Sequence, residues 1–127
     1  MKKERKISKH IDCCRIRFKK YEIICQPDKD YGSGCDLIIA NKEKKIIILC
    51  EVKRGSISTA DINDAIKEIE TTLEKIKNTY KRYRVIKTFI HCGGGRFYSK
   101  CREILIKKGI YKLTSNHDID KQLEKFI

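Results

Sequence analysis

The segment 46–53 constrains the fold more than any other part of the chain. Five apolar residues follow one another from Ile46 to Cys50, and Glu51, Val52 and Lys53 complete the segment. β-branched runs of this kind are typical of strands, in which consecutive side chains point to opposite faces of the sheet. A strand that is apolar on both faces lies in the middle of a sheet that helices cover. The sequence therefore predicts an α/β fold.

A long one-sided helix should follow this strand. Gly55 and the residues after it break the strand, and Ser58 or Thr59 can cap a helix that has Asp61 in its first turn. Apolar residues then recur mostly at spacings of three or four, which indicates about six helical turns. These residues are Ile62, Ala65, Ile66, Ile69, Leu73, Ile76, Tyr80 and Tyr83.

The remaining elements complete a mixed sheet. We expect strands over 21–25, 35–40, 85–92 and 110–113, a first helix (or a basic tail) from near Ser8, and helices over 97–108 and 118–126. The polar stretch 41–45 makes 35–40 and 46–53 a hairpin, and the long helix makes 46–53 and 85–92 a parallel pair. We therefore predict one domain, 1–127, with an αβββαβ core over about 7–92, a C-terminal α-β-α extension over about 96–127, and helices on both faces of the sheet.

The charge of the chain indicates an anionic partner. Lys and Arg number 30 and Asp and Glu 17, which gives a net charge of +13. Such a charge favours nucleic acid first and a lipid surface second. No apolar run approaches the roughly 18–20 residues that cross a bilayer, and the basic N-terminus lacks the apolar stretch of a secretory signal. We expect no membrane partner and a cytoplasmic protein, in the host cytoplasm if the source is a virus.

The seven cysteines form no C-x-x-C pair, so a zinc ribbon or a redox motif is disfavoured. Several lie among strand-like apolar residues, where a free thiol behaves as a small hydrophobic side chain. Buried thiols are the favoured interpretation, and one or two disulfides are the alternative.

Three charged residues form the constellation that most strongly suggests chemistry. Glu51 and Lys53 share one face of their strand, and a turn centred near Glu43 places Asp36 opposite residue 50 or 51. Two carboxylates suit a hard divalent cation such as Mg²⁺, with Mn²⁺ as a substitute. A nearby ammonium can hold an attacking water or stabilise developing negative charge. An ordinary ion pair at the edge of the sheet is the bland alternative.

The arrangement resembles the PD-(D/E)xK nuclease superfamily. The matching residues are the Gly32-Ser33-Gly34 loop, the Asp36-Leu37-Ile38 strand and Glu51-Val52-Lys53, inside an α-β-β-β-α-β order. The likeness is closest to archaeal Holliday-junction resolvases and to restriction-endonuclease-like proteins of archaea and their viruses. It implies a restriction-endonuclease-like fold and a Mg²⁺-dependent DNA endonuclease or resolvase that acts as a homodimer. By this resemblance Asp36, Glu51 and the Val52 carbonyl are metal ligands and Lys53 is the catalytic ammonium.

The resemblance leaves some positions open. Many members carry an acid on the first helix, for which this chain offers only Glu4 or Asp12, and no Gln lies on the helix after Lys53. Asp28 follows Pro27 as in the name motif, but Asp36 is the preferred ligand because of its place at the start of a strand.

Basic and small polar residues are candidates for DNA contacts: Ser33, Lys42, Lys44, Lys45, Arg54 and Arg96. For the three lysines of the 41–45 turn, simple solubility is the alternative. The triple glycine before Arg96 is either a flexible turn or a phosphate cradle, and without a G-K-[ST] ending it predicts no nucleotide cofactor. Two other functions remain open: a non-catalytic nucleic-acid-binding protein of the same fold, and an interaction protein whose long helix binds a partner.

Overall fold

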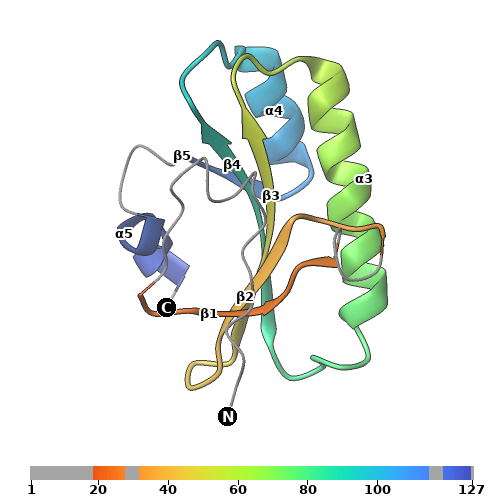
Figure 1. The fold of residues 1–127 in the computed structure, drawn as a ribbon, viewed down its shortest axis with the longest axis vertical. Coiled ribbons are helices and arrows are strands. Elements are labelled where there is room, and N and C mark those ends of the chain that lie inside the picture. The colour runs from red at the N-terminus through yellow and green to blue at the C-terminus, as the bar shows by residue number, and fades with distance from the viewer. Residues whose placement is uncertain (1–18, 28–31, 115–118, 127) are drawn as a thin grey trace.

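The computed structural model describes residues 19–27, 32–114 and 119–126, which form an α/β structure around one five-stranded mixed sheet (Figure 1). The strands are β1 (Glu22–Cys25), β2 (Leu37–Asn41), β3 (Ile46–Arg54), β4 (Arg84–Cys92) and β5 (Ile110–Thr114), in the spatial order β1-β2-β3-β4-β5. The first three strands pair antiparallel, whereas β3, β4 and β5 pair parallel. The predicted hairpin and the predicted crossover are both confirmed.

Strand β3 lies in the middle of the sheet, as its apolar sequence requires. All its residues from Ile46 to Val52 are buried. Helices α3 (Thr59–Ile76) and α4 (Ser99–Lys107) cover one face, and α5 (Ile119–Leu123) lies on the other, as Figure 1 shows. Alternate residues of β3 accordingly enter two separate cores, with Ile47 and Leu49 towards α3 and Ile48 and Cys50 on the opposite face. The prediction of helices on both faces is confirmed.

Helix α3 begins where the sequence indicates but ends earlier. Ser58 caps it, with its hydroxyl accepting from the Asp61 N–H and the Asp61 carboxylate accepting from the Ser58 N–H. The helix ends at Ile76 rather than near Tyr83, and turns follow. Asn78 and Thr79 have low helix propensity, which accounts for the early end. Tyr80 and Tyr83 lie in these turns and still pack against the core, which explains why their spacing in the sequence fits a helical pattern.

The C-terminal elements differ from expectation only at their ends. Helix α4 stops before Gly109, whose φ of +68° suits a residue without a side chain. A 3₁₀ turn, Glu124–Phe126, follows α5. Strand β5 pairs with β4, so the expected extension joins the same sheet as the expected core. The expected first helix and its candidate acids Glu4 and Asp12 lie outside the described residues, as does Asp28.

The cysteines in the described residues are mostly buried thiols. Cys25, Cys35, Cys50 and Cys101 are free and buried, whereas Cys92 is disulfide-bonded. Burial raises the pKa of the Cys35 thiol to about 12, so this thiol stays protonated and behaves as an apolar side chain. No helix in the described parts of the chain is both long enough and apolar enough to span a bilayer.

Candidate functional site

The register of the β2–β3 hairpin brings Asp36 beside Glu51. Asn41 pairs with Ile46 and Leu37 with Cys50, so the residue before β2 lies opposite Glu51, as the sequence predicts. The Asp36 carboxylate accepts a hydrogen bond of 2.7 Å from the Val52 N–H. The Asp36 carboxyl is also close enough to Glu51 to help raise the pKa of Glu51. The two carboxyl groups therefore lie close together in the C-terminal half of β3.

Burial of Glu51 makes this pair electrostatically unusual. The residue is only 4% exposed. Burial, and then the neighbouring Asp36 carboxylate, raises the pKa of Glu51 to about 9, although Lys53 acts in the opposite direction. In the absence of a cation, Glu51 is therefore held mainly as the neutral acid at pH 7.

Lys53 completes the group from the same face of β3. Its ammonium Nζ lies 4.0 Å from Glu51 Oε2, and about a third of its side chain is exposed. An ion pair at this distance and exposure contributes little to stability. The Lys53 charge is therefore available to a ligand that enters from solvent.

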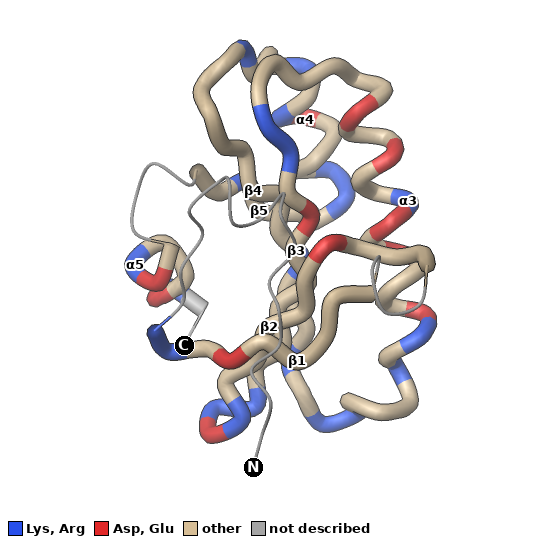
Figure 2. The backbone as a smooth tube through the Cα atoms, in the orientation of Figure 1, with Lys and Arg blue, Asp and Glu red and all other residues tan. Residues whose placement is uncertain are grey.

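The three side chains line one open cavity of about 330 Å³. Its floor comes from β3 and the start of β2, and its rim comes from the loop before β2 and from α3. The lining residues are Gly32, Ser33, Gly34, Asp36, Glu51, Lys53, Asp64 and Glu68. Figure 2 shows basic positions at the upper end of β3 and acidic positions on the neighbouring helix α3.

Helix α3 fixes the loop that precedes Asp36. Glu68 accepts a hydrogen bond of 2.9 Å from the Gly34 N–H, and the Thr72 hydroxyl accepts one of 2.7 Å from the Cys35 N–H. Lys75 donates to the backbone and the hydroxyl oxygens of Ser33. Because Glu68, Thr72 and Lys75 follow at spacings of four and three, they lie on one helix face, and that face positions the loop and hence Asp36.

The donor set at the site fits a hard divalent cation. Within the described residues, no group of three or more His, Cys, Asp or Glu side chains is arranged to hold a metal ion. Mg²⁺, however, keeps several waters and is commonly held by one or two carboxylates together with substrate phosphates. Asp36 and Glu51 supply two carboxylates in contact. The Val52 carbonyl faces the same side of β3 as its N–H, which is the side where Asp36 lies.

The candidate DNA contacts separate into two groups. Lys42, Lys44 and Lys45 are exposed in the β2–β3 turn, at the opposite end of β3 from Glu51. Ile46 and Glu51 are five residue steps apart along the strand, or about 17 Å. Lys42 also forms a 3.1 Å ion pair with Glu22. The structure does not bring these lysines into the cavity.

Arg54 and Arg96 lie at the same end of the sheet as the cavity. Arg54 follows Lys53 on β3, and its side chain packs over Gly93. The Arg96 N–H donates to the Ser56 hydroxyl, and its carbonyl accepts from Ile57, so the glycine-rich loop lies along the end of β3. A Cβ on Gly95 would lie 2.4 Å from the Gly55 backbone, which explains why a glycine stands there.

Sequence reasoning missed two residues of the cavity, Asp64 and Glu68. Both lie on α3 and line the cavity. Together with Asp61 they follow at spacings of three and four along one flank of the apolar stripe. This spacing was the available signal, since it places all three on one side of the helix.

Comparison of the chain with protein-family models, curated proteins and solved structures gives no match. The functional argument therefore rests on the residues of the site.

Proposed function

We propose that this protein is a Mg²⁺-dependent DNA endonuclease or resolvase with a restriction-endonuclease-like fold. The observation that supports it best is the convergence of Asp36, Glu51 and Lys53 on one open cavity. Two adjoining carboxylates repel each other when both are ionised, and a divalent cation relieves that repulsion. A pair of this kind, next to an ammonium and open to solvent, suits phosphodiester hydrolysis.

In the proposed reaction Asp36, Glu51 and the Val52 carbonyl would hold the cation. When bound, Mg²⁺ or Mn²⁺ would lower the pKa of water and stabilise charge on the phosphoryl oxygens. The Lys53 ammonium holds the attacking water by a hydrogen bond or stabilises the developing negative charge. The water oxygen bonds to phosphorus and releases a proton to solvent, the bond to the leaving oxygen breaks, and that oxygen takes up a proton from solvent.

The basic surface beside the cavity positions the substrate. Arg54 and Arg96 are exposed at the same end of the sheet as Lys53 and are the favoured phosphate contacts. Phosphate contacts fix the register of a duplex without selecting a sequence. We further propose a homodimer, because one domain of this size reaches one strand and symmetric cleavage needs two sites.

A non-catalytic nucleic-acid-binding protein of the same fold is the second candidate. It is favoured by the raised pKa of Glu51, because a neutral acid beside a carboxylate needs no cation. The net charge of +13 serves either function equally. The apolar stripe of α3, by contrast, is buried against its own sheet, so a partner-binding role of that stripe has no support.

Metal-dependent cleavage separates the two candidates. We expect the wild-type protein to cut linear or branched DNA with Mg²⁺ or Mn²⁺ and to stop when EDTA removes the metal. Glu51→Gln should lose cleavage but keep DNA binding. Glu70→Gln is the matched control, because Glu70 is exposed on α3 and outside the cavity. DNA binding without cleavage under every metal and substrate would refute the nuclease proposal.

A further inference from the structure

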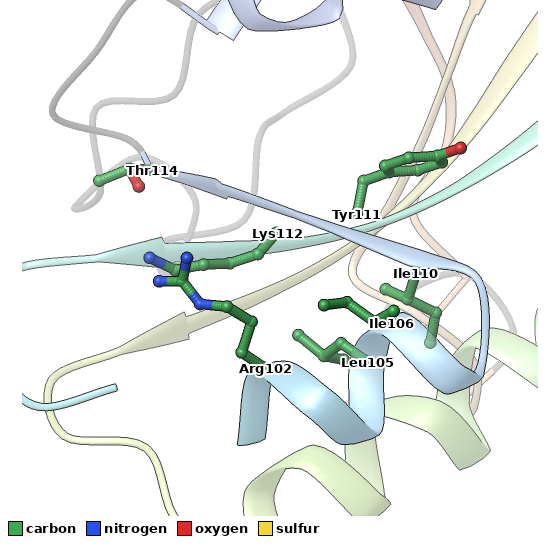
Figure 3. A pocket seen from close by; sticks show the side chains of 7 residues that line it. All are labelled: Arg102, Leu105, Ile106, Ile110, Tyr111, Lys112 and Thr114. Atoms are coloured by element: carbon green, nitrogen blue, oxygen red, sulfur yellow. The ribbon is translucent and has the colours of Figure 1, made fainter. Parts of the chain in front are cut away.

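A second cavity lies between α4 and β5, at the edge of the sheet that β5 forms. Its volume is about 350 Å³, and Figure 3 shows the side chains that line it. These residues are Arg102, Leu105, Ile106, Ile110, Tyr111, Lys112 and Thr114. Figure 3 also shows that Tyr111 points to the opposite side of β5 from the others. The result is a groove with an apolar floor and two cations at one end.

The two cations at that end have no acidic partner among the described residues. Neither Arg102 nor Lys112 forms an ion pair there, and the Lys112 ammonium lies 4.7 Å from the centre of the Phe97 ring. Burial and then the Arg102 charge lower the pKa of Lys112, so the two cations are close enough to repel each other. An anion placed between them would relieve this repulsion.

Residue Thr114 adds a hydroxyl at the same end of the groove. Its backbone N–H donates to the Gln122 side chain, and its carbonyl accepts from the same amide, at 3.0 and 2.9 Å. These two bonds imitate the pairing of a neighbouring strand and occupy the edge of β5 at this point. An added peptide strand is therefore blocked here, whereas the Thr114 side chain remains on the groove.

The groove is level with the candidate active site. Across the parallel strands Glu51 pairs with Phe89 and Phe89 with Lys112, so these three residues form one row. The next row on this face joins Lys53 and Thr114 through His91. Two strand spacings separate Glu51 from Lys112, or about 10 Å. This span corresponds to about three base-pair rises of duplex DNA.

We propose that Arg102, Lys112 and Thr114 form a phosphate-binding subsite that holds a backbone phosphate of a nucleic-acid strand passing the candidate active site. This assignment of a substrate position rests on the proposed nuclease function. Arg102 supplies planar N–H donors to the phosphate oxygens, Lys112 a second positive charge and Thr114 a hydroxyl donor. The apolar floor at Leu105, Ile106 and Ile110 faces the sugar carbons next to that phosphate.

The test measures DNA binding in EDTA, so that cleavage plays no part. A short fluorescein-labelled duplex is titrated with the wild type, with Arg102→Gln/Lys112→Gln, and with Lys100→Gln/Lys107→Gln. The last variant removes the same charge from exposed positions on α4 outside the groove. We expect the groove variant to weaken binding by about tenfold or more and to lower the salt slope of log K by about one, whereas the control changes binding by less than about threefold.

Two further measurements keep the test decisive. Thr114→Val removes only the hydroxyl and should weaken binding by about threefold, which tests the groove even if the double variant unfolds. Inorganic phosphate, compared with chloride at equal ionic strength, should raise the melting temperature of the wild type by more than that of the groove variant, because phosphate stabilises any folded protein to some extent by exclusion from its surface.

Equal weakening by the groove and control variants would overturn the subsite, because charge alone would then explain the loss. An unchanged affinity of the groove variant would overturn it as well. If the wild type never cuts DNA but the groove variant still loses phosphate-dependent binding, the nuclease proposal fails while the anion site stands.

Discussion

Asp36 Oδ2 accepts a hydrogen bond of 2.7 Å from the backbone N–H of Val52, just beyond the point where β2 begins to pair with β3. The carboxylate thus provides the acceptor that a longer β2 would have supplied to this buried part of β3. The same side chain contacts Glu51. Asp36 therefore satisfies a backbone donor at the end of the β2–β3 pairing and also supplies a carboxylate to the candidate metal site.

This double role predicts that two substitutions of Asp36 have different effects on stability. Asp36→Asn keeps an oxygen acceptor for the Val52 N–H, whereas Asp36→Ala leaves that N–H unsatisfied and should cost about 1–3 kcal/mol. Urea denaturation measures the difference. Both variants should lose metal-dependent cleavage, since neither supplies a second carboxylate. Cleavage by Asp36→Asn at the wild-type rate would exclude Asp36 as a metal ligand.

The raised pKa of Glu51 predicts a pH dependence of stability in the absence of metal. The pKa is about 9 in the folded protein, against 4.5 for an unperturbed Glu, so the folded state binds the extra proton. The stabilisation that this proton gives is complete below pH 4.5 and is lost as the pH rises towards about 9. In EDTA the free energy of unfolding should therefore fall with rising pH, by up to about 1.4 kcal/mol per unit.

Glu51→Gln should remove most of that slope, and Glu70→Gln should leave it intact. Denaturant titrations in EDTA, from roughly pH 6 to pH 8, measure the slope for the three proteins. Added Mg²⁺ should stabilise the wild type most at the high-pH end, where cation binding no longer has to displace the Glu51 proton. A slope that is the same in Glu51→Gln and wild type would show that Glu51 is not the titrating group.

The position of Lys53 predicts a loss of rate without a loss of binding. Among the described residues Lys53 forms only a long ion pair, so removing its ammonium in Lys53→Gln should change stability by less than about 1 kcal/mol. Cleavage under single-turnover conditions should slow by about 100-fold or more, because the ammonium acts on charge that develops in the transition state. A rate that falls only in proportion to DNA affinity would make Lys53 a binding residue instead.

Much of the site follows from strand periodicity. The side chains of β3 alternate strictly, and the polar stretch 41–45 places Asp36 opposite residue 50 or 51. The observed register, with Leu37 opposite Cys50, puts it beside Glu51. The early end of α3 and the positions of Asp64 and Glu68 were harder to predict. The helix end was obscured because Tyr80 and Tyr83 continue the apolar spacing beyond Ile76. The places of Asp64 and Glu68 depend on how the helix is rotated against the sheet, which tertiary packing decides.

The candidate DNA contacts show a different limit of the sequence. Charge alone grouped Lys42, Lys44 and Lys45 with Arg54 and Arg96, but strand direction places them at opposite ends of β3. The groove at β5 could not be predicted from the sequence, because Arg102 and Lys112 come together only when α4 packs on the edge of the sheet.

The loop before Asp36 predicts unequal effects for two glycine substitutions. Both glycines have positive φ, +75° at Gly32 and +120° at Gly34. A Cβ at Gly32 meets open space, so Gly32→Ala should cost only the backbone strain, about 1–2 kcal/mol. At Gly34 the Cβ would lie 2.7 Å from the Pro27 Cβ and 2.8 Å from the Thr72 hydroxyl oxygen, and both are closer than atoms can pack.

Gly34→Ala must therefore displace Thr72, whose hydroxyl holds the Cys35 N–H directly beside Asp36. We expect this variant to lose at least about 2 kcal/mol more stability than Gly32→Ala, from steric overlap and a broken buried hydrogen bond. Its cleavage rate should fall as well, because the start of β2 shifts. Thermal denaturation and cleavage assays on the two variants, side by side, measure both effects. Equal stability of the two variants would mean that α3 does not hold this loop in solution.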